Sequence, residues 1–303
     1  MPLYLFNGED NMKKNNKLGY YFLAPLLILQ GIFVFYPLFY TIYLSFFKWN
    51  MVSPNKRFVG FDNYVRVLTD AKFHRIIGNT FLYVLIFVVC SCLLPYLAAF
   101  VMDVVVTKFK KFYTGIFFIP AVISLVVVGM VYTWILNPVS GPIAIILKSL
   151  GLTMPMWSNQ QGWVIAVIAL ITSWKVFGYN FIVLYAAIMG IDRELIDAAK
   201  IDNISTWTIF RKIVLPLSSS TGIYILIISI VQGLQYVFTP IKIITKGGPN
   251  YASSNLIYHS YQTAFEMFKV GESAAVSVIT LLIFALLLAL TFKFIERRVY
   301  YEN

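Results

Sequence analysis

Charged residues are scarce in this chain of 303 residues, and histidine and cysteine are scarcer still, with two of each. Asp, Glu, Lys and Arg make up 12% of the sequence, which is about half of their share in an ordinary soluble domain. By contrast, 59% of the residues are hydrophobic and the mean hydropathy is +0.77. This composition argues against a water-soluble fold and predicts an all-α integral membrane protein.

Motifs of catalysis and metal binding are missing as well. No Gly-x-x-x-x-Gly-Lys-Ser/Thr phosphate loop occurs, so the chain is not expected to bind ATP. His74 and His259 lie in separate segments and belong to no metal-ligand or nucleophile-base pattern. Cys90 and Cys92 point in different directions on one presumed helix, so no disulfide framework or metal site follows. We expect neither an enzyme nor a cofactor bound by this chain.

The net charge of +11 does not indicate nucleic acid as a partner. The basic residues lie in short clusters between apolar runs, where they would flank membrane spans. No signal peptide is predicted, because residues 1–17 are polar and the apolar run that follows is too long for one. Membrane lipid is therefore the expected surrounding.

Six apolar runs are long enough to cross a bilayer as helices, which takes about 20 residues each. An even number of spans places both termini on one side. The runs are Leu18–Phe47, Thr80–Val106, Phe112–Leu136, Trp163–Met189, Leu217–Phe238 and Ala274–Phe294.

A polar stretch at residues 190–216 separates the fourth run from the fifth and reads as a hairpin of two short helices. Leu195, Ala198, Ala199 and Asp202 recur at i, i+3, i+4 and i+7, which predicts a narrow face of small side chains suited to docking. Asn203 tolerates the left-handed conformation that ends a helix. The second helix is predicted to have an N-cap at Ser205, an apolar stripe of Trp207, Phe210 and Val214, and an end at Pro216.

The stretch Asp197-Ala198-Ala199-x-x-Asp202-Asn203, followed by Phe210, Ile213 and Leu215-Pro216, resembles the "EAA" loop of permease subunits in binding-protein-dependent ABC importers. Asp197 replaces the usual Glu and keeps the charge, and Asn203 replaces the usual Gly and keeps the backbone tolerance. The resemblance implies a coupling helix that inserts into a groove on a cytoplasmic ATPase subunit. The residues implied in coupling are Leu195, Asp197, Ala198, Ala199, Asp202, Asn203, Trp207 and Phe210. The alternative is a cytoplasmic loop packed only on its own protein.

Under this interpretation, replacing Ala199 with Trp is expected to leave the protein inserted in the membrane but to block solute uptake.

The resemblance extends over nearly the whole chain. Segments similar to the sugar-uptake branch of these permeases are Phe58–Tyr64, Phe118-Ile119-Pro120 and Trp134-x-x-Asn137-Pro138. Thr245-x-Gly247-Gly248-Pro249 resembles the outer-face loop typical of one of the two permease types that pair in such transporters, and it also reads as a tight turn.

What the resemblance implies is a six-span ABC importer permease of type I. Residues 1–17 would be a cytoplasmic segment, 18–75 the first span and outer loop, 76–295 the permease domain with the coupling loop 190–216, and 296–303 a cytoplasmic tail. The implied partners are a second homologous permease subunit, a cytoplasmic ATPase dimer that holds ATP and Mg, and an extracellular solute-binding protein. The implied location is the bacterial cytoplasmic membrane, with which the Lys and Arg distribution agrees only by a narrow margin.

Lys175 lies near the middle of the fourth run, roughly 18 Å from its start at Trp163 at helical rise. A lysine at that depth costs about 2.5–3.5 kcal/mol, so it should face a partner or a wet cavity. Asp103, the one acid within a run, lies at a different depth, and pairing with it is not expected. Solute oxygens, an anion, the companion permease, or backbone carbonyls at a helix irregularity are the alternatives.

Polar and aromatic side chains surround Lys175 and recur in the fifth run. Carbohydrate recognition needs both kinds, because sugar hydroxyls require hydrogen-bonding partners and the C–H faces require an aromatic surface. The candidates are Thr172, Trp174, Lys175, Val176, Tyr179, Asn180, Ser229, Gln232, Gln235 and Tyr236, of which Thr172, Val176, Tyr179, Ser229 and Tyr236 fall close to sugar-cavity positions of the similar maltose permease. Helix packing is the alternative for each.

The sequence thus predicts a permease that imports a sugar, either an oligosaccharide or a polyol, by alternating access driven by ATP hydrolysis on separate subunits. An importer of the same build for an anionic solute, such as a glycerol phosphoester or a uronate, is one alternative. A channel or secondary carrier that needs no ATPase is another. A membrane-embedded enzyme is disfavoured because no acidic or histidine cluster occurs at membrane depth.

Overall fold

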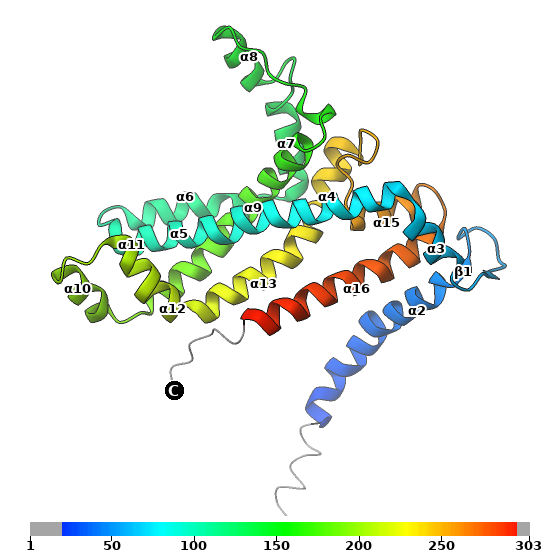
Figure 1. Ribbon diagram of the computed structural model, residues 1–303, viewed down its shortest axis with the longest axis horizontal. Helices are drawn as coiled ribbons and strands as arrows, with labels where there is room; N and C mark the ends of the chain where they lie inside the picture. Colours follow the sequence, from blue (N-terminus) through cyan, green and yellow to red (C-terminus); the bar gives the residue numbers. More distant parts are fainter. Residues whose placement is uncertain (1–19, 296–303) are drawn as a thin grey trace, which may run out of the picture.

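The computed structural model describes residues 20–295 and shows a bundle of long helices that lie roughly along one axis (Figure 1). Five of its helices are long and apolar enough to span a membrane, and a bent helix pair brings the number to six when it is counted as one span. The five are Tyr20–Ser45, Ala71–Val105, Trp163–Met189, Ser219–Thr245 and Val270–Lys293. The six predicted spans agree with this number when the bent pair is included. The segments 1–17 and 296–303, predicted to be cytoplasmic, lie outside the described residues.

Three of the spans are continuous series of α-helical segments and π-helical turns, whereas α9 and α16 are uninterrupted α-helices. The segments of the spans are η1 (Gly31–Phe35), α2 (Tyr36–Ser45), α4 (Ala71–Val88), η2 (Val89–Leu93), α5 (Leu94–Phe100), η3 (Val101–Val105), α6 (Lys110–Val122), α7 (Leu125–Ile135), α9 (Trp163–Met189), α13 (Ser219–Gln235), α14 (Phe238–Pro240), η6 (Ile241–Thr245) and α16 (Val270–Ile295). The connecting elements are β1 (Phe47–Lys48), β2 (Arg57–Phe58), α3 (Asp62–Thr69), α8 (Pro142–Ser149), η4 (Trp157–Asn159), α10 (Arg193–Ile201), α11 (Thr206–Ile209), η5 (Phe210–Val214), α12 (Leu215–Leu217) and α15 (Leu256–Phe265).

The second span begins nine residues before the predicted start, at Ala71 rather than Thr80. Asp70 caps the helix there, because its side chain accepts a hydrogen bond of 2.9 Å from the backbone N of Lys72. Phe73 and Ile76 in the added turns are buried in a core shared with α13, α15 and α16. Packing on the protein itself therefore extends the helix beyond its most apolar part.

The third span was predicted as one helix, Phe112–Leu136, and this is wrong. It consists of α6 and α7, which meet at an angle of 97°. Pro120 lies in the last turn of α6, where it lacks an N–H for the helix, and the backbone is extended at Ile123 and Ser124. Figure 1 shows α7 and α8 projecting sideways from the bundle as a consequence.

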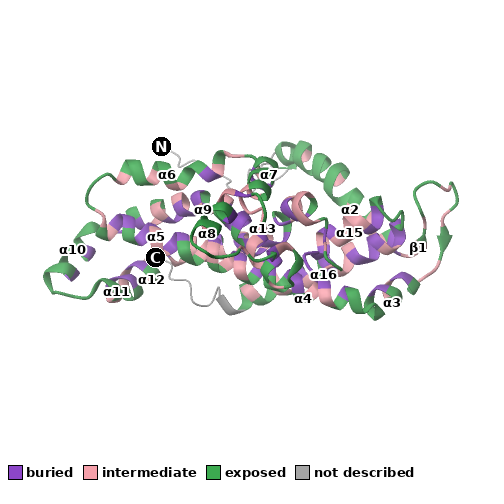
Figure 2. Cartoon of the chain, turned by 90° about the horizontal axis from the view of Figure 1, so that it is seen from above, coloured by how far each residue is buried: buried purple, intermediate pink, exposed green. Residues whose placement is uncertain are grey.

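The first span stands apart from the rest of the bundle (Figure 1, blue). Only Leu44 and Ser45 of α2 are buried, and α2 packs against α16 alone among the other spans with substantial contact. Viewed from above, α2 and α6 are exposed over most of their length, whereas the buried residues lie between α4, α9, α13 and α16 (Figure 2). The first span thus offers an apolar surface to lipid or to another subunit.

The two ends of the bundle carry different structures. The polar hairpin, defined as residues 190–216, lies at one end, and the two-stranded sheet of β1 and β2 lies at the other (Figure 1). The strands are antiparallel and pair Phe47 with Phe58 and Lys48 with Arg57.

The predicted tight turn at Gly247 is confirmed: φ is +79°, and a Cβ there would lie 2.8 Å from the ring of Tyr258.

Candidate functional site

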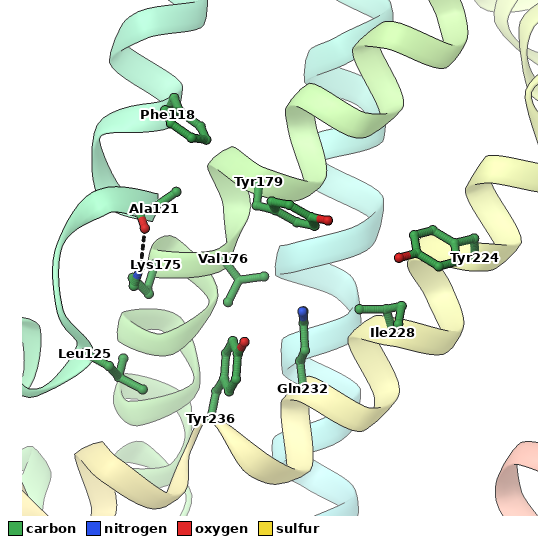
Figure 3. Close-up of a pocket in the computed structure, with 10 residues that line it drawn as sticks. All are labelled: Phe118, Ala121, Leu125, Lys175, Val176, Tyr179, Tyr224, Ile228, Gln232 and Tyr236. Carbon is green, nitrogen blue, oxygen red and sulfur yellow. Dashed lines mark hydrogen bonds between the residues drawn. The ribbon is translucent and has the colours of Figure 1, made fainter. Parts of the chain in front are cut away.

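A cavity of about 530 Å³ lies between α9, α13 and the bend that joins α6 to α7 (Figure 3). Four aromatic rings reach it from these elements, together with one amide and one ammonium group. Its lining residues are Phe118, Ala121, Leu125, Lys175, Val176, Tyr179, Tyr224, Ile228, Gln232 and Tyr236. No acid is among them, so the only formal charge in the lining is that of Lys175.

The ammonium group of Lys175 has a hydrogen-bond partner at the break in the third span. Its Nζ donates a hydrogen bond to the backbone O of Ala121, near the end of α6, where the helix stops supplying donors to its carbonyls (Figure 3). Of the alternatives for Lys175, the backbone carbonyl at a helix irregularity is the contact observed. An ammonium group has three donors, so two are left for other partners in the cavity.

Five predicted pathway residues meet at this cavity although they come from two separate runs. They are Lys175, Val176, Tyr179, Gln232 and Tyr236. Tyr179 and Tyr236 are 48% and 39% exposed, so their rings are open to a ligand. The Oε1 atom of Gln232 is buried and has no hydrogen-bond partner within residues 20–295, and the amide nitrogen of this side chain points into the cavity (Figure 3).

The prediction omitted the other five lining residues. Phe118, Ala121 and Leu125 enter the cavity because the third span bends, and Pro120 was the only signal of that bend in the sequence. Tyr224 and Ile228 precede Gln232 and Tyr236 at steps of four along α13. This spacing places all four on one helix face and could have identified them.

Three predicted pathway residues are buried in helix contacts instead of lining the cavity, and this corrects the prediction for Thr172, Asn180 and Ser229. Each is 0% exposed. Thr172 donates to the backbone O of Ile168, at 2.7 Å. Asn180 donates to Ser91 O at 2.5 Å and to Ser229 Oγ at 3.3 Å, and so joins α9 to η2 and α13. Their polar groups serve helix packing.

Two further predicted residues also lie away from the cavity lining. Trp174 is 38% exposed and its ring packs edge-on against Tyr132, with centroids 5.6 Å apart. Gln235 borders a different pocket, between α13, α15 and α16. Both residues lie on helices that line the cavity but on other faces of them.

The polar hairpin forms as its local sequence predicts. Asp192 caps α10 through a bond of 3.0 Å from Glu194 N, and Ser205 caps α11 through one of 3.3 Å from Thr208 N. Asn203 has φ of +54°, the left-handed conformation expected at the end of α10. Ile204 N then bonds to Ala199 O at 3.0 Å, which closes the helix end.

The two faces of α10 differ from the predicted arrangement. Ile196 and Ala199 are 0% and 4% exposed, so they face the protein's own core, whereas Leu195 is 49% exposed and Ala198 and Asp202 are exposed as well. The predicted docking face therefore loses Ala199. Asp197 and Asn203 are also exposed.

On the second helix, Phe210 and Val214 are buried, but Trp207 is 58% exposed and stacks on Phe210 with centroids 5.3 Å apart. Phe210 in turn packs on Tyr96 and Phe100 of α5, with centroids 5.7 and 4.9 Å away. The predicted apolar stripe thus faces inward except at Trp207. We call the buried residues Ile196, Ala199, Ile209, Phe210 and Val214 the hairpin root, because they pack on α5 and α9 in one core.

An ion pair that the sequence did not suggest joins the hairpin to the second span. Arg193, the first residue of α10, binds Asp103 of η3 through Nη2 and Oδ1. The Asp103 side chain is 1% exposed and that of Arg193 is 46% exposed. The bond to Asp103 raises the pKa of the Arg193 guanidinium. Lys110 donates to the backbone O of Asp103 at 2.9 Å, so three segments meet at this residue.

Residues 96–301 match the family described as the binding-protein-dependent transport system inner membrane component. This range contains the polar hairpin, α9, α13 and the whole cavity lining. The chain belongs to this family of permeases. It is therefore a multi-pass membrane permease and a transport component, not a catalytic subunit.

Two relatives align with the permease over nearly their whole length. The sn-glycerol-3-phosphate transport system permease protein UgpA of Agrobacterium fabrum is 32% identical over 288 residues, which are 95% of this chain and 97% of the relative. The probable ABC transporter permease protein YurN of Bacillus subtilis is 30% identical over 288 residues, which are 94% and 98%.

A solved structure shows the same fold. It is the crystal structure of a bacterial alginate ABC transporter in complex with an alginate pentasaccharide-bound periplasmic protein. The permease superposes on one of its chains with a TM-score of 0.79 and 23% identity, and the match covers 92% of this chain and 93% of the other. The predicted six-span importer permease fold is thereby confirmed.

Proposed function

We propose that the permease carries a carbohydrate or polyol through the cavity between α9, α13 and the α6–α7 bend. The observation that carries this proposal is the lining, which combines Phe118, Tyr179, Tyr224 and Tyr236 with the side-chain amide of Gln232. Aromatic faces pack on the C–H surfaces of a sugar ring, while hydroxyl and amide groups bond to its hydroxyls.

An anionic solute of similar size, such as a glycerol phosphoester or a uronate, is the second candidate. Lys175 favours it, because its ammonium is the single charge in the lining and keeps donors beyond the bond to Ala121. The relatives named as sn-glycerol-3-phosphate permeases are consistent with this candidate. The two candidates differ in one testable respect, which is the need for the charge of Lys175.

We further propose that the exposed face of the polar hairpin docks into a groove on a cytoplasmic ATPase subunit. This face presents Leu195, Ala198 and Ile201, and Trp207 is exposed beside it. Asp197 and Asp202 add charge to it. Small and apolar side chains on an exposed helix suit helix-in-groove binding. This orientation would place the hairpin in the cytoplasm and the β1–β2 end outside, in a bacterial cytoplasmic membrane with both termini inside.

The mechanism that follows is alternating access around the cavity. ATP and Mg would bind to the ATPase dimer, and a second homologous permease subunit would complete the path. An extracellular solute-binding protein would deliver the solute. The exposed first span is a surface on which the companion permease could pack.

Reconstitution tests the proposal. The permease, its companion, the ATPase subunits and the solute-binding protein are co-purified and placed in vesicles, and uptake is measured with neutral sugars, polyols, glycerol phosphoesters and uronates. We expect uptake only with ATP and the binding protein. Uptake by the permease without the ATPase would instead indicate a channel or secondary carrier and would refute the coupling proposal.

A variant distinguishes the two solute classes. Lys175→Gln removes the charge but keeps hydrogen-bonding groups. If the solute is a neutral sugar, its uptake should fall by less than about tenfold, whereas uptake of an anion should fall by considerably more, since hydrogen bonds to charged groups contribute about 1.5–3 kcal/mol. Equal effects on both classes would show that Lys175 serves only to secure the α6–α7 bend.

A further inference from the structure

We propose that a basic pocket at the β1–β2 end of the molecule binds the carboxylate or phosphate group of a small carbohydrate-like solute. The pocket has a volume of about 430 Å³ and shares no lining residue with the central cavity. It lies at the end of the bundle opposite the polar hairpin, where β1 and α3 are seen in Figure 1. Its lining is Lys48, Trp49, Asn50, Ser53, Asn55, Arg57, Asn63, Arg66, Phe268, Lys269, Gly271 and Glu272.

The charge in this pocket is almost entirely positive. Four cations line it against one acid, and that acid, Glu272, is engaged by Lys269 at 3.5 Å. Lys48, Arg57 and Arg66 form no ion pair with any acid in residues 20–295. Three like charges around one concavity repel one another, and a bound anion would relieve this repulsion.

The start of α16 adds to the positive potential. This helix has 26 residues and begins at Val270, and its first turn contributes Gly271 and Glu272 to the pocket wall. The N–H groups of a first helical turn have no partner within the helix and favour negative charge. A Cβ at position 271 would lie 1.7 Å from Phe47 O, so glycine is what allows this helix start to approach the wall so closely.

Hydrogen bonds hold the walls of the pocket in place without a ligand. Asn63 is 3% exposed, and its Nδ2 donates to Ser45 O at 2.8 Å and to Phe47 O at 3.0 Å. Val270 N donates to Trp49 O at 2.9 Å, which joins α16 to the loop after β1. A site assembled in advance loses less free energy to ordering when the ligand binds.

The remaining lining residues indicate the class of ligand. The volume falls within the range of roughly 300–1,000 Å³ that is usual for small-molecule sites. Arg57 and Arg66 present the planar donor pairs that match carboxylate and phosphate oxygens. Trp49 and Phe268 supply flat apolar surfaces, and Asn50 and Asn55 supply amides for hydroxyl groups. A uronate or a sugar phosphate satisfies all three requirements, and a neutral sugar leaves the cations unused.

Calorimetric titration of the full chain in lipid nanodiscs tests this site. The probes are glucuronate and glucose 6-phosphate, which separate the carboxylate from the phosphate source, and glucose is the neutral control. We expect binding of at least one anion, weakened by added salt, and none of glucose. Arg57→Gln and Arg66→Gln should each weaken the anion roughly tenfold, and Glu272→Gln should tighten it.

Matched variants locate the binding. Lys148→Gln removes an exposed cation on α8 and should change nothing, and Arg57→Lys should retain part of the affinity that Arg57→Gln loses. Anion binding that disappears in Lys175→Gln would belong to the central cavity and would overturn the proposal. The absence of binding for both anions, unchanged binding in both Arg→Gln variants, or engagement of the pocket only by an acidic segment of a protein partner would overturn it as well. Because the titration needs no transport, its outcome is separate from that of the uptake assays.

Discussion

The hairpin root and the central cavity are built in opposite ways. In the root, Ile196 and Val214 are fully buried and Ala199 is 4% exposed, and they pack in one core with residues of α5 and α9. In the cavity, Tyr179 and Tyr224 are almost half exposed around a volume of about 530 Å³. A close-packed region moves as one body, whereas a region with free volume can change shape. We therefore expect the hairpin root to move as a rigid unit and the central cavity to change shape around a solute.

One helix connects these two regions. α9 carries Lys175, Val176 and Tyr179 at the cavity and ends at Met189, next to the polar hairpin. The distance from Tyr179 to Met189 is roughly 15 Å at helical rise. Gly178 fixes α9 against α6, because a Cβ there would lie 2.2 Å from Phe117 O. A displacement of the hairpin would therefore reach the cavity wall without an intervening hinge.

The largest expected effects separate the two faces of α10. Ala199→Trp inserts a large ring into the hairpin root and should cost about 1–3 kcal/mol or more, so that the folded yield falls. Ala198→Trp places the same ring on the exposed face, where it should leave the melting temperature unchanged but abolish uptake and solute-stimulated ATPase activity. Normal uptake by a well-folded Ala198→Trp permease would contradict the docking role.

The ion pair at the hairpin root provides the next test. Arg193→Met leaves the buried Asp103 carboxylate without its partner, which should destabilise the protein by about 3–5 kcal/mol and strongly reduce uptake. Adding Asp103→Asn to this variant removes the unpaired charge and should restore most of the melting temperature. The control is Lys200→Met, because its pair with Asp197 is exposed and should contribute less than about 1 kcal/mol. Equal losses in both lysine and arginine variants would contradict a special role for the buried pair.

Lowering the pH tests His259, which lies on α15, outside both the hairpin root and the central cavity. Its effect on the stability of the whole protein can therefore be measured separately from changes in those two regions. Burial lowers the pKa of His259 on α15 from 6.5 to about 4. The neutral form is then favoured in the folded protein, and stability is complete above pH 6.5 and falls as the pH drops toward 4. The loss between pH 7 and 4.5 should be about 2 kcal/mol.

The variant His259→Phe should flatten this pH dependence, and replacement of the exposed His74 by Asn should leave it intact. Thermal unfolding at a series of pH values measures both. A wild-type melting temperature that rises as the pH falls from 6.5 to 4.5 would show that His259 is not held neutral.

The smallest effect is expected in the cavity, where one side chain can be lost without disturbing the fold. Gln232→Ala removes the one amide group of the lining and should raise the KM for the transported solute about tenfold, at an unchanged melting temperature. Gln235→Ala, three residues further along α13 and outside the cavity lining, is the matched control and should have no effect on KM. A larger effect of Gln235→Ala would place the solute elsewhere.

Local chemistry made much of the fold predictable. The spans followed from apolar runs, and the hairpin turns followed from Asn203 and Ser205, whose conformations depend only on their neighbours in the sequence. Within the cavity, Lys175 was predictable because its charge is costly at that depth. Tyr179 and Tyr236 followed from the resemblance.

Long-range contacts set the limit of that prediction. Asp103 and Arg193 are 90 positions apart, and nothing in either local sequence indicates the other. On α10, apolar residues lie on both faces of the helix. The sequence therefore predicted one docking face that includes both Ala198 and Ala199, but the fold exposes Ala198 and buries Ala199. Asn180 donates a hydrogen bond to Ser229 across two helices, and sequence cannot distinguish such a pair from ligand contacts.

The row of Tyr224, Ile228, Gln232 and Tyr236 on α13 has a practical consequence for altering what the permease accepts. Residues on the opposite side of this helix, such as Ile230, are buried against neighbouring spans, and they can stay untouched while the row is varied. A combinatorial library at these four positions would sample new solute preferences on an unaltered scaffold. The choice of solute could then be altered at the α13 row while the polar hairpin, and with it the proposed coupling to ATP hydrolysis, stays unchanged.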